Sequence, residues 1–198
     1  MPQTKLPLSL SNTLVMVCIS LLSISLFLFE PYSSQALQYD RLAINNGEWF
    51  RLISGHFLHT NFTHLAFNLI GFLLLWALHG DDYTITNNLI LIVYLGFAVS
   101  FSIHYFSPEL SLYVGLSGVL HGLFCWGVIQ DIRKKMTTGY LLFIGAVLKI
   151  GSEQLYGAGA LMPTLIEADV AVDSHLYGAI FGTIGGIVCA LFSKKENT

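Results

Sequence analysis

Four polar side chains that could carry out acyl transfer lie in otherwise apolar stretches of this sequence. They are Ser117, His175, His64 and Asn68. Ser117 stands between glycines in the run 115–118, at the predicted start of a helix. A serine there can attack a carbonyl carbon, and the unpaired backbone N–H groups of the helix start can hold the oxyanion that forms. The alternative is that Ser117 only caps the helix.

His175 is the candidate for the base that takes the proton of Ser117. It opens an apolar run in which Gly178 and Gly182 follow at helical spacing, so His175 continues a helix face without other side chains. Such a face packs closely against another helix, and Gly118 offers a matching surface next to Ser117. The spacing therefore makes a Ser–His contact between two helices plausible.

Two other residues bear on the identity and orientation of the base. His121 follows Ser117 by four residues and is a rival base on the same helix. Asp173 is two residues from His175 and points elsewhere on a helix, and no acidic residue is placed to orient His175. We therefore predict a serine–histidine dyad rather than a triad.

His64 and Asn68 are four residues apart and share one face of a predicted helix. Two hydrogen-bond donors aimed at one point could supplement the backbone N–H groups around an oxyanion. The alternative is an interhelical hydrogen-bonded pair that only holds a helix bundle together.

Metal binding and disulfide formation are less well supported. The spacing of His56, His59 and His64 occurs in membrane enzymes that bind iron or zinc, but no carboxylate accompanies it in the same span. We expect no metal and no other cofactor. The three cysteines have no CxxC spacing and are interpreted as apolar packing residues; they are Cys18, Cys125 and Cys189.

The composition is that of an integral membrane protein. Of 198 residues, 54% are hydrophobic and 11% are charged, whereas a soluble domain carries about a quarter charged residues. The net charge of -3 excludes the basic surface that nucleic-acid binding needs. The partners expected are therefore the lipid bilayer and proteins within it, and not nucleic acid.

Six apolar runs divide the chain into predicted membrane spans, which makes it an all-α polytopic protein with a single membrane domain over residues 1–198. The runs are Leu6–Phe29, Phe62–Leu78, Leu89–Phe106, Leu112–Ile129, Tyr140–Leu155 and Ser174–Phe192. The first is interpreted as a retained helix rather than a signal peptide.

Residues 30–61 are too many for a simple connection and predict a structured loop at the membrane surface. Residues 157–172 contain glycines and could form a cap.

The basic residues predict an orientation for the six spans. With six spans both ends lie on one side, and that side collects six of the basic residues, which are Lys5, Arg133, Lys134, Lys135, Lys194 and Lys195. Arg41 and Arg51 fall on the other side. The positive-inside rule then places both termini in the cytoplasm. Within the fifth span, Lys149 and Glu153 can meet as a structural ion pair.

Three motifs together resemble the rhomboid family of intramembrane serine proteases. They are His64-x3-Asn68, Gly115-x-Ser117-Gly118 and His175-x2-Gly178-x3-Gly182, on the second, fourth and sixth of the six spans. The resemblance covers about residues 48–192 and implies a six-helix bundle in which Ser117 attacks a peptide carbonyl. His175 would then accept the serine proton and return it.

The resemblance also implies roles for the neighbours of the dyad. The backbone N–H of Ser117, with His64 and Asn68, would stabilise the oxyanion, and Gly115 and Leu116 would belong to the same substrate-stabilising site. Substrates would be transmembrane or membrane-anchored proteins that enter between the second and fifth helices. The active site would face the periplasm of a bacterial inner membrane.

This chain departs from the usual family pattern at two positions. Phe50 takes the place directly before Arg51 where the family usually has tryptophan, and His121 stands where many members have a tyrosine that packs on the catalytic histidine. The second departure leaves the ring-packing role open.

The short chain resembles one branch of the family, the rhombosortases. The resemblance is carried by the runs Asp40-Arg41, Ser117-Gly118-Val119-Leu120-His121-Gly122 and Glu153-Gln154-Leu155-Tyr156-Gly157. It implies that the substrates are exported bacterial proteins with a removable C-terminal anchor. Two alternatives stay open: a non-catalytic rhomboid-like protein that binds transmembrane helices, and a metalloenzyme or ion carrier that depends on the histidine cluster.

Overall fold

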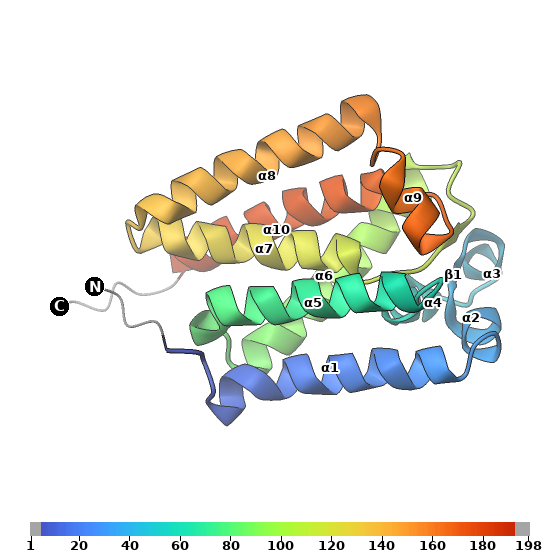
Figure 1. Ribbon diagram of the computed structural model, residues 1–198, viewed down its shortest axis with the longest axis horizontal. Helices are drawn as coiled ribbons and strands as arrows, with labels where there is room; N and C mark the ends of the chain where they lie inside the picture. The colour runs from blue at the N-terminus through green and yellow to red at the C-terminus, as the bar shows by residue number, and fades with distance from the viewer. Residues whose placement is uncertain (1–4, 193–198) are drawn as a thin grey trace.

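The computed structural model describes residues 5–192 and is built almost entirely from helices (Figure 1). Six helices of 17 or more residues make up the bundle in this described range. They are α1 (Leu10–Leu28), α5 (Phe62–His79), α6 (Ile85–Phe106), α7 (Ser117–Arg133), α8 (Thr137–Tyr156) and α10 (Val172–Phe192). The all-α polytopic fold predicted from the sequence is confirmed.

Four of these helices are long and apolar enough by themselves to cross a membrane. They are α1, α5 with the turn that follows it, α6 and α10. The other two fall short: α7 has 17 residues, and α8 carries the charged residues Lys149 and Glu153. Of these two, α7 carries residues of the predicted site, and α8 carries the predicted ion pair.

Of the six predicted spans, only the second begins where its helix does, at Phe62. The third and fourth show the reason for the difference. The third begins earlier, at Ile85, because Thr84 and Asn87 form a capping box that starts α6. The fourth begins later, at Ser117, because Leu112 and Tyr113 form strand β2 (Leu112–Tyr113) instead of a helical turn.

Residues 30–61 form a set of short elements. They are α2 (Tyr32–Leu37), β1 (Tyr39–Asp40), α3 (Arg41–Asn45), α4 (Arg51–Ser54) and the 3-10 helix η1 (Gly55–Phe57). β1 pairs antiparallel with β2, with Tyr39 opposite Tyr113. This pairing fixes the segment to the loop that leads into Ser117.

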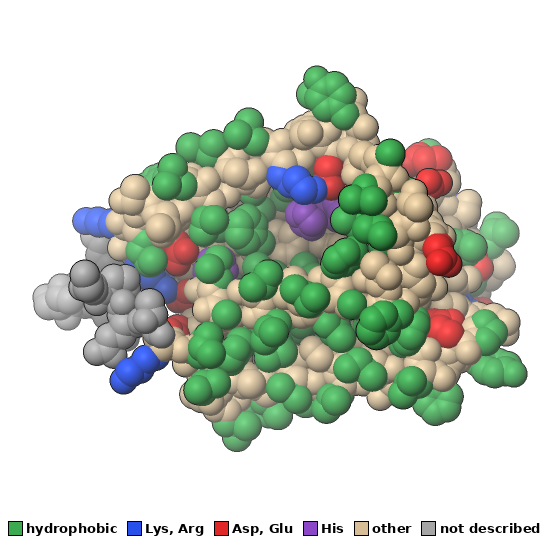
Figure 2. Space-filling model, viewed as in Figure 1, with side chains coloured by type: hydrophobic (Ala, Val, Ile, Leu, Met, Phe, Trp, Pro, Cys, Tyr) green, Lys and Arg blue, Asp and Glu red, His purple; other side chains and the backbone are tan. Residues whose placement is uncertain are grey.

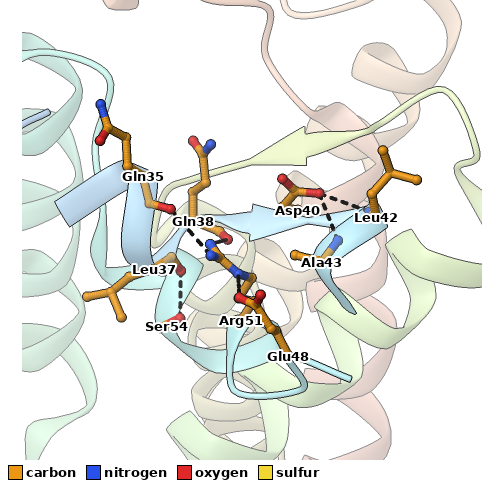
Figure 3. A network of polar contacts seen from close by, with 9 residues as sticks. All are labelled: Gln35, Leu37, Gln38, Asp40, Leu42, Ala43, Glu48, Arg51 and Ser54. Carbon is orange, nitrogen blue, oxygen red and sulfur yellow. Dashed lines mark hydrogen bonds and ion pairs between the residues drawn. The ribbon is translucent and has the colours of Figure 1, made fainter. Parts of the chain in front are cut away.

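Two arginines hold this segment in place. The guanidinium of Arg51 donates to the carbonyls of Gln38 and Gln35 and pairs with Glu48, as Figure 3 shows. Arg41 donates to several carbonyls at and beyond the C-terminal end of α6, including that of His104. Carbonyls at a helix C-terminus lack partners within the helix, so a cation there satisfies them and complements the dipole.

The closest helix contact in the bundle joins α7 to α10. A Cβ on Gly178 would collide with the carbonyl oxygen of Gly118, and one on Gly182 would collide with that of Gly122. Glycines on both helices let the backbones approach this closely. The contact brings the start of α7 next to the start of α10, where Ser117 and His175 lie.

The outer surface of the bundle is apolar, as Figure 2 shows for one face. Of the six long helices, α1 and α8 are the most open to the surroundings: α1 buries only Val15 and Ser23, and α8 buries only Gly139, Ile150 and Glu153. The remaining elements are the 3-10 helix η2 (Gly80–Asp82) after α5 and the short helix α9 (Leu161–Ile166) between α8 and α10.

Several basic residues lie at one end of the bundle. α1 begins, α7 joins α8 and α10 ends at one end, while α2, α3 and α9 lie at the other (Figure 1). The C-terminal end of α7 and the α7–α8 connection carry Arg133, Lys134 and Lys135 of the predicted cytoplasmic side, and Lys134 pairs with Asp82 at 2.6 Å. Two other basic residues of the predicted cytoplasmic side, Lys194 and Lys195, lie outside the described residues.

Candidate active site

Ser117 and His175 meet where α7 and α10 begin. Gly115 adopts a backbone φ of +122°, which favours glycine, and turns the chain from β2 into α7, whose first residue is Ser117. The distance from Ser117 Oγ to His175 Nε2 is 3.0 Å. This is the hydrogen-bond distance required for a histidine to take the proton of a serine nucleophile.

Glu153 lies on the other side of the His175 ring, where no carboxylate was predicted. Its Oε2 is 3.0 Å from His175 Nδ1, and its Oε1 pairs with Lys149 one turn earlier on α8. The expectation that no acidic residue orients His175 is therefore wrong. Asp173, the acidic residue nearest in sequence, instead accepts a hydrogen bond from Ser107.

His121 stacks on His175. The two ring centroids are 4.1 Å apart and the planes differ by 17°. Nδ1 of His121 is 2.8 Å from the backbone carbonyl oxygen of Ser117 and so donates to it. His121 thus fills the ring-packing position that the sequence left open, and its Nδ1 is not directed at the Ser117 hydroxyl.

His64 lies beside the turn before Ser117. Its ring is so close to Gly115 that a Cβ there would be 2.8 Å from Nε2. Nδ1 of His64 is 3.2 Å from the hydroxyl of Thr60, and the side chain of Asn61 caps the start of α5 by accepting from the His64 backbone N–H. The His64 ring is therefore held against the Gly115 backbone on the approach to the serine.

Asn68 lies one turn further along α5 and is also buried. Its Nδ2 donates to the His64 carbonyl at 2.9 Å. An amide nitrogen has two hydrogens, so a second donor is left for another acceptor. Both His64 and Asn68 line the same cavity as Ser117.

A cavity of about 1020 Å³ connects these residues with the outside of the bundle. Its walls come from α5, α7 and α8, and its polar lining is His64, Asn68, Ser117, His121, Lys149, Glu153 and His175. Figure 2 shows the hollow on this face, with histidine inside it and hydrophobic side chains around its rim. The nucleophile is thus reached from the side of the bundle, between α5 and α8.

Comparison with known proteins matches this arrangement to one family. A family model described as the rhomboid domain covers residues 46–192, well over half of the chain. The chain belongs to the rhomboid family. A relative named "Putative rhomboid protease YdcA", from Bacillus subtilis (strain 168), is 30% identical over 181 residues, which is 86% of this chain and 84% of its own.

In this rhomboid, residues 157–172 form part of the cavity wall. Helix α9 lies within this segment, and Met162 and Ile166 line the cavity. The hydroxyl of Thr60 donates to the Ile166 carbonyl at 2.6 Å, and the amide of Asn61 donates to that of Leu165 at 3.0 Å. These bonds tie the segment to the loop before α5.

The structure brings together potential metal ligands other than the His56, His59 and His64 set considered from the sequence. Within residues 5–192, a group whose ligand atoms all lie within 4.8 Å of one another is His121, Glu153 and His175. His56, in contrast, donates through Nε2 to the Gly96 carbonyl at 2.8 Å. Burial lowers the pKa of His56, which lies outside the spanning helices, to about 4, so this ring is neutral at pH 7.

One feature of the sequence could have identified Glu153 as a site residue. Glu153 follows Lys149 by four residues inside a span, and a charge there is expensive unless it serves a partner or a cavity. The pairing with Lys149 was predicted and is present. The contact with His175 was missed because it depends on how α8 and α10 pack.

Proposed function

We propose that this rhomboid is an intramembrane serine endopeptidase with Ser117 as nucleophile and His175 as base. The observation that carries the proposal is the 3.0 Å contact between Ser117 Oγ and His175 Nε2. Both residues line a cavity that opens between α5 and α8. A protein that only binds other helices would need neither group in this arrangement.

In the proposed reaction, Ser117 Oγ attacks the carbonyl carbon of the scissile peptide while His175 Nε2 takes the serine proton. The resulting imidazolium gives this proton to the nitrogen of the leaving peptide, and the C–N bond breaks to leave an ester on Ser117. Water then attacks the ester while His175 takes a proton from the water; the C–Oγ bond breaks, and His175 returns the proton to Ser117 Oγ, which releases the acid product and restores the free serine. The polar lining of the cavity supports entry of this water into an otherwise apolar bundle.

The oxyanion formed in each addition step would be held by the backbone N–H of Ser117 and the side chains of His64 and Asn68. Residues Gly115 and Leu116 form the turn that aims this backbone, and Leu116 is 1% exposed. Donors held rigidly before the reaction stabilise the developing charge without reorganisation.

The substrates we propose are membrane-anchored proteins that enter through the opening between α5 and α8. The narrower proposal, from the resemblance to rhombosortases, is that they are exported bacterial proteins whose C-terminal anchor is removed. We place the protein in a bacterial inner membrane, with both termini cytoplasmic and Ser117 towards the periplasm. The basic α7–α8 connection, at the end opposite α9, supports this orientation.

Fluorophosphonate labelling of the detergent-solubilised protein tests the proposal. We expect labelling of the wild type that is lost in both Ser117→Ala and His175→Ala, each of which should elute as a folded protein on size exclusion. Labelling should be unaffected by EDTA. A folded wild type that resists labelling would favour the non-catalytic helix binder, and loss of labelling on chelation would favour a metal at His121, Glu153 and His175.

A further inference from the structure

The carboxylate of Glu153 is buried at the base of the proposed nucleophile. The residue is 6% exposed, and its two oxygens have different partners: Lys149 on one and His175 Nδ1 on the other. The side chain of Lys149 is 59% exposed and stands at the cavity mouth. Glu153 therefore links a charge at the cavity entrance to the ring that contacts Ser117.

The ion pair with Lys149 accounts for one oxygen of Glu153 but not for the burial of the other against His175 of α10. A second cavity of about 460 Å³ lies on the other side of α8, between α8 and α10, so α8 is loosely packed on both flanks. Burying a carboxylate costs free energy unless the group is paired, and an apolar side chain would fill the space without that cost. The placement of Glu153 against Nδ1 thus points to a role in orienting His175.

We propose that Glu153 is a positioning residue that completes a Ser117–His175–Glu153 triad, an inference that rests on the proposed protease function. Its Oε2 accepts the Nδ1–H of His175, which leaves the lone pair of Nε2 directed at Ser117. When Nε2 takes the serine proton, the carboxylate stabilises the imidazolium and does not itself take the proton. Lys149 holds the second carboxylate oxygen and so fixes the side chain.

Peptide-cleavage kinetics of Glu153→Gln in detergent test this role. The substitution keeps the size of the side chain and removes its charge, so we expect kcat to fall by about 100-fold to 10,000-fold with KM little changed and the melting temperature retained. Glu153→Asp keeps the charge, and its kcat should lie between those of Glu153→Gln and the wild type. The matched control is Asp173→Asn, which changes the other carboxylate near His175 and should leave kcat within a few-fold of wild type.

Chemical rescue separates positioning from a structural role. Glu153→Ala leaves space beside His175 at the cavity, and formate should restore part of the lost kcat, whereas acetamide should not. If Glu153→Gln cleaves with wild-type kcat, or if formate has no effect on a folded Glu153→Ala, the triad is wrong while the protease function stands. If wild type itself fails to label at Ser117, the protease function is what fails.

Discussion

At the scale of single residues, the site is defined by how the His175 ring is surrounded. Ser117 contacts one ring nitrogen, Glu153 contacts the other, and His121 covers one face. An imidazole fixed on three sides has little freedom to turn away from the serine, and such preorganisation is a large part of catalysis. His64 and Asn68 of α5 line the same cavity.

The stacking of His121 on His175 predicts a difference between two substitutions. His121→Tyr keeps a ring in the same place and should keep cleavage within a few-fold of wild type. His121→Ala loses the ring contact, and since aromatic pairs contribute about 0.5–1.5 kcal/mol, we expect kcat/KM to fall by up to about 10-fold. Cleavage assays on both variants check this, and an inactive but folded His121→Tyr would show that His121 itself acts as a base.

The buried ring of His56 predicts that stability depends on pH. Its pKa is lowered by burial from 6.5 to about 4, so below pH 6.5 the unfolded chain binds a proton that the folded chain does not. The free energy of unfolding should therefore fall as the pH drops from 6.5 towards 4, by about 2 kcal/mol at pH 5 from this group.

Thermal unfolding in detergent at pH 7.5 and pH 5.0 measures this dependence. His56→Gln removes the titrating group, so its melting temperature should change less between the two pH values than that of the wild type. An equal change in both proteins would mean that His56 is not responsible.

At the scale of elements, the helices around the candidate site differ in packing: α7 and α10 pack tightly against each other, whereas α8 is loosely packed. The glycine contact between α7 and α10 leaves no room for side chains, so Ser117 and His175 are fixed relative to each other. α8 faces a cavity on each side and contributes Glu153. The cavity at Ser117 is thus bounded by the helix whose Glu153 contacts His175.

Two glycines of α8 provide a matched test of which cavity admits the substrate. Gly145 lines the larger cavity at Ser117, Gly151 lines the smaller one, and a Cβ on either would meet nothing within 4 Å. Gly145→Leu should slow cleavage of a transmembrane substrate by about 10-fold or more, since a blocked approach prevents the reactive geometry. Gly151→Leu should cleave like wild type.

Fluorophosphonate labelling controls for damage to the site itself, because the small probe should still reach Ser117 in both variants. Slower cleavage by Gly151→Leu with normal cleavage by Gly145→Leu would place substrate entry on the α8–α10 side.

At the scale of the whole molecule, the candidate site lies towards one end, and the basic cluster of Arg133, Lys134 and Lys135 lies at the other. The loops that carry α9 and β2 belong to one end, and the α7–α8 connection beside these basic residues belongs to the other (Figure 1). This asymmetry predicts the orientation of the protein in its membrane.

Cysteine labelling in intact and permeabilised bacterial cells tests that orientation. In a chain whose three cysteines are replaced by alanine, Glu109→Cys and Thr138→Cys place a thiol at an exposed position of each end. A membrane-impermeant maleimide that reaches the periplasm should label Glu109→Cys in intact cells and Thr138→Cys only after the inner membrane is opened. The reverse pattern would invert the proposed topology.

The sequence by itself determined the membrane class, the all-α fold and the pairing of a serine-bearing helix with a glycine-faced one. These follow from local patterns: apolar runs long enough to span, and glycines at helical spacing beside His175. The early start of α6 also had a local signal in Thr84 and Asn87, although the span was predicted from Leu89. Such features are readable because each depends on residues close together in the chain.

Only the tertiary structure decided which groups surround His175. The Glu153 contact joins residues 22 positions apart on separate helices, and the stacking of His121 depends on the rotation of α7 against α10. The β1–β2 pairing likewise brings Tyr39 to Tyr113 across two spans. No local pattern encodes these contacts, because the packing of side chains between helices sets their relative rotation and depth.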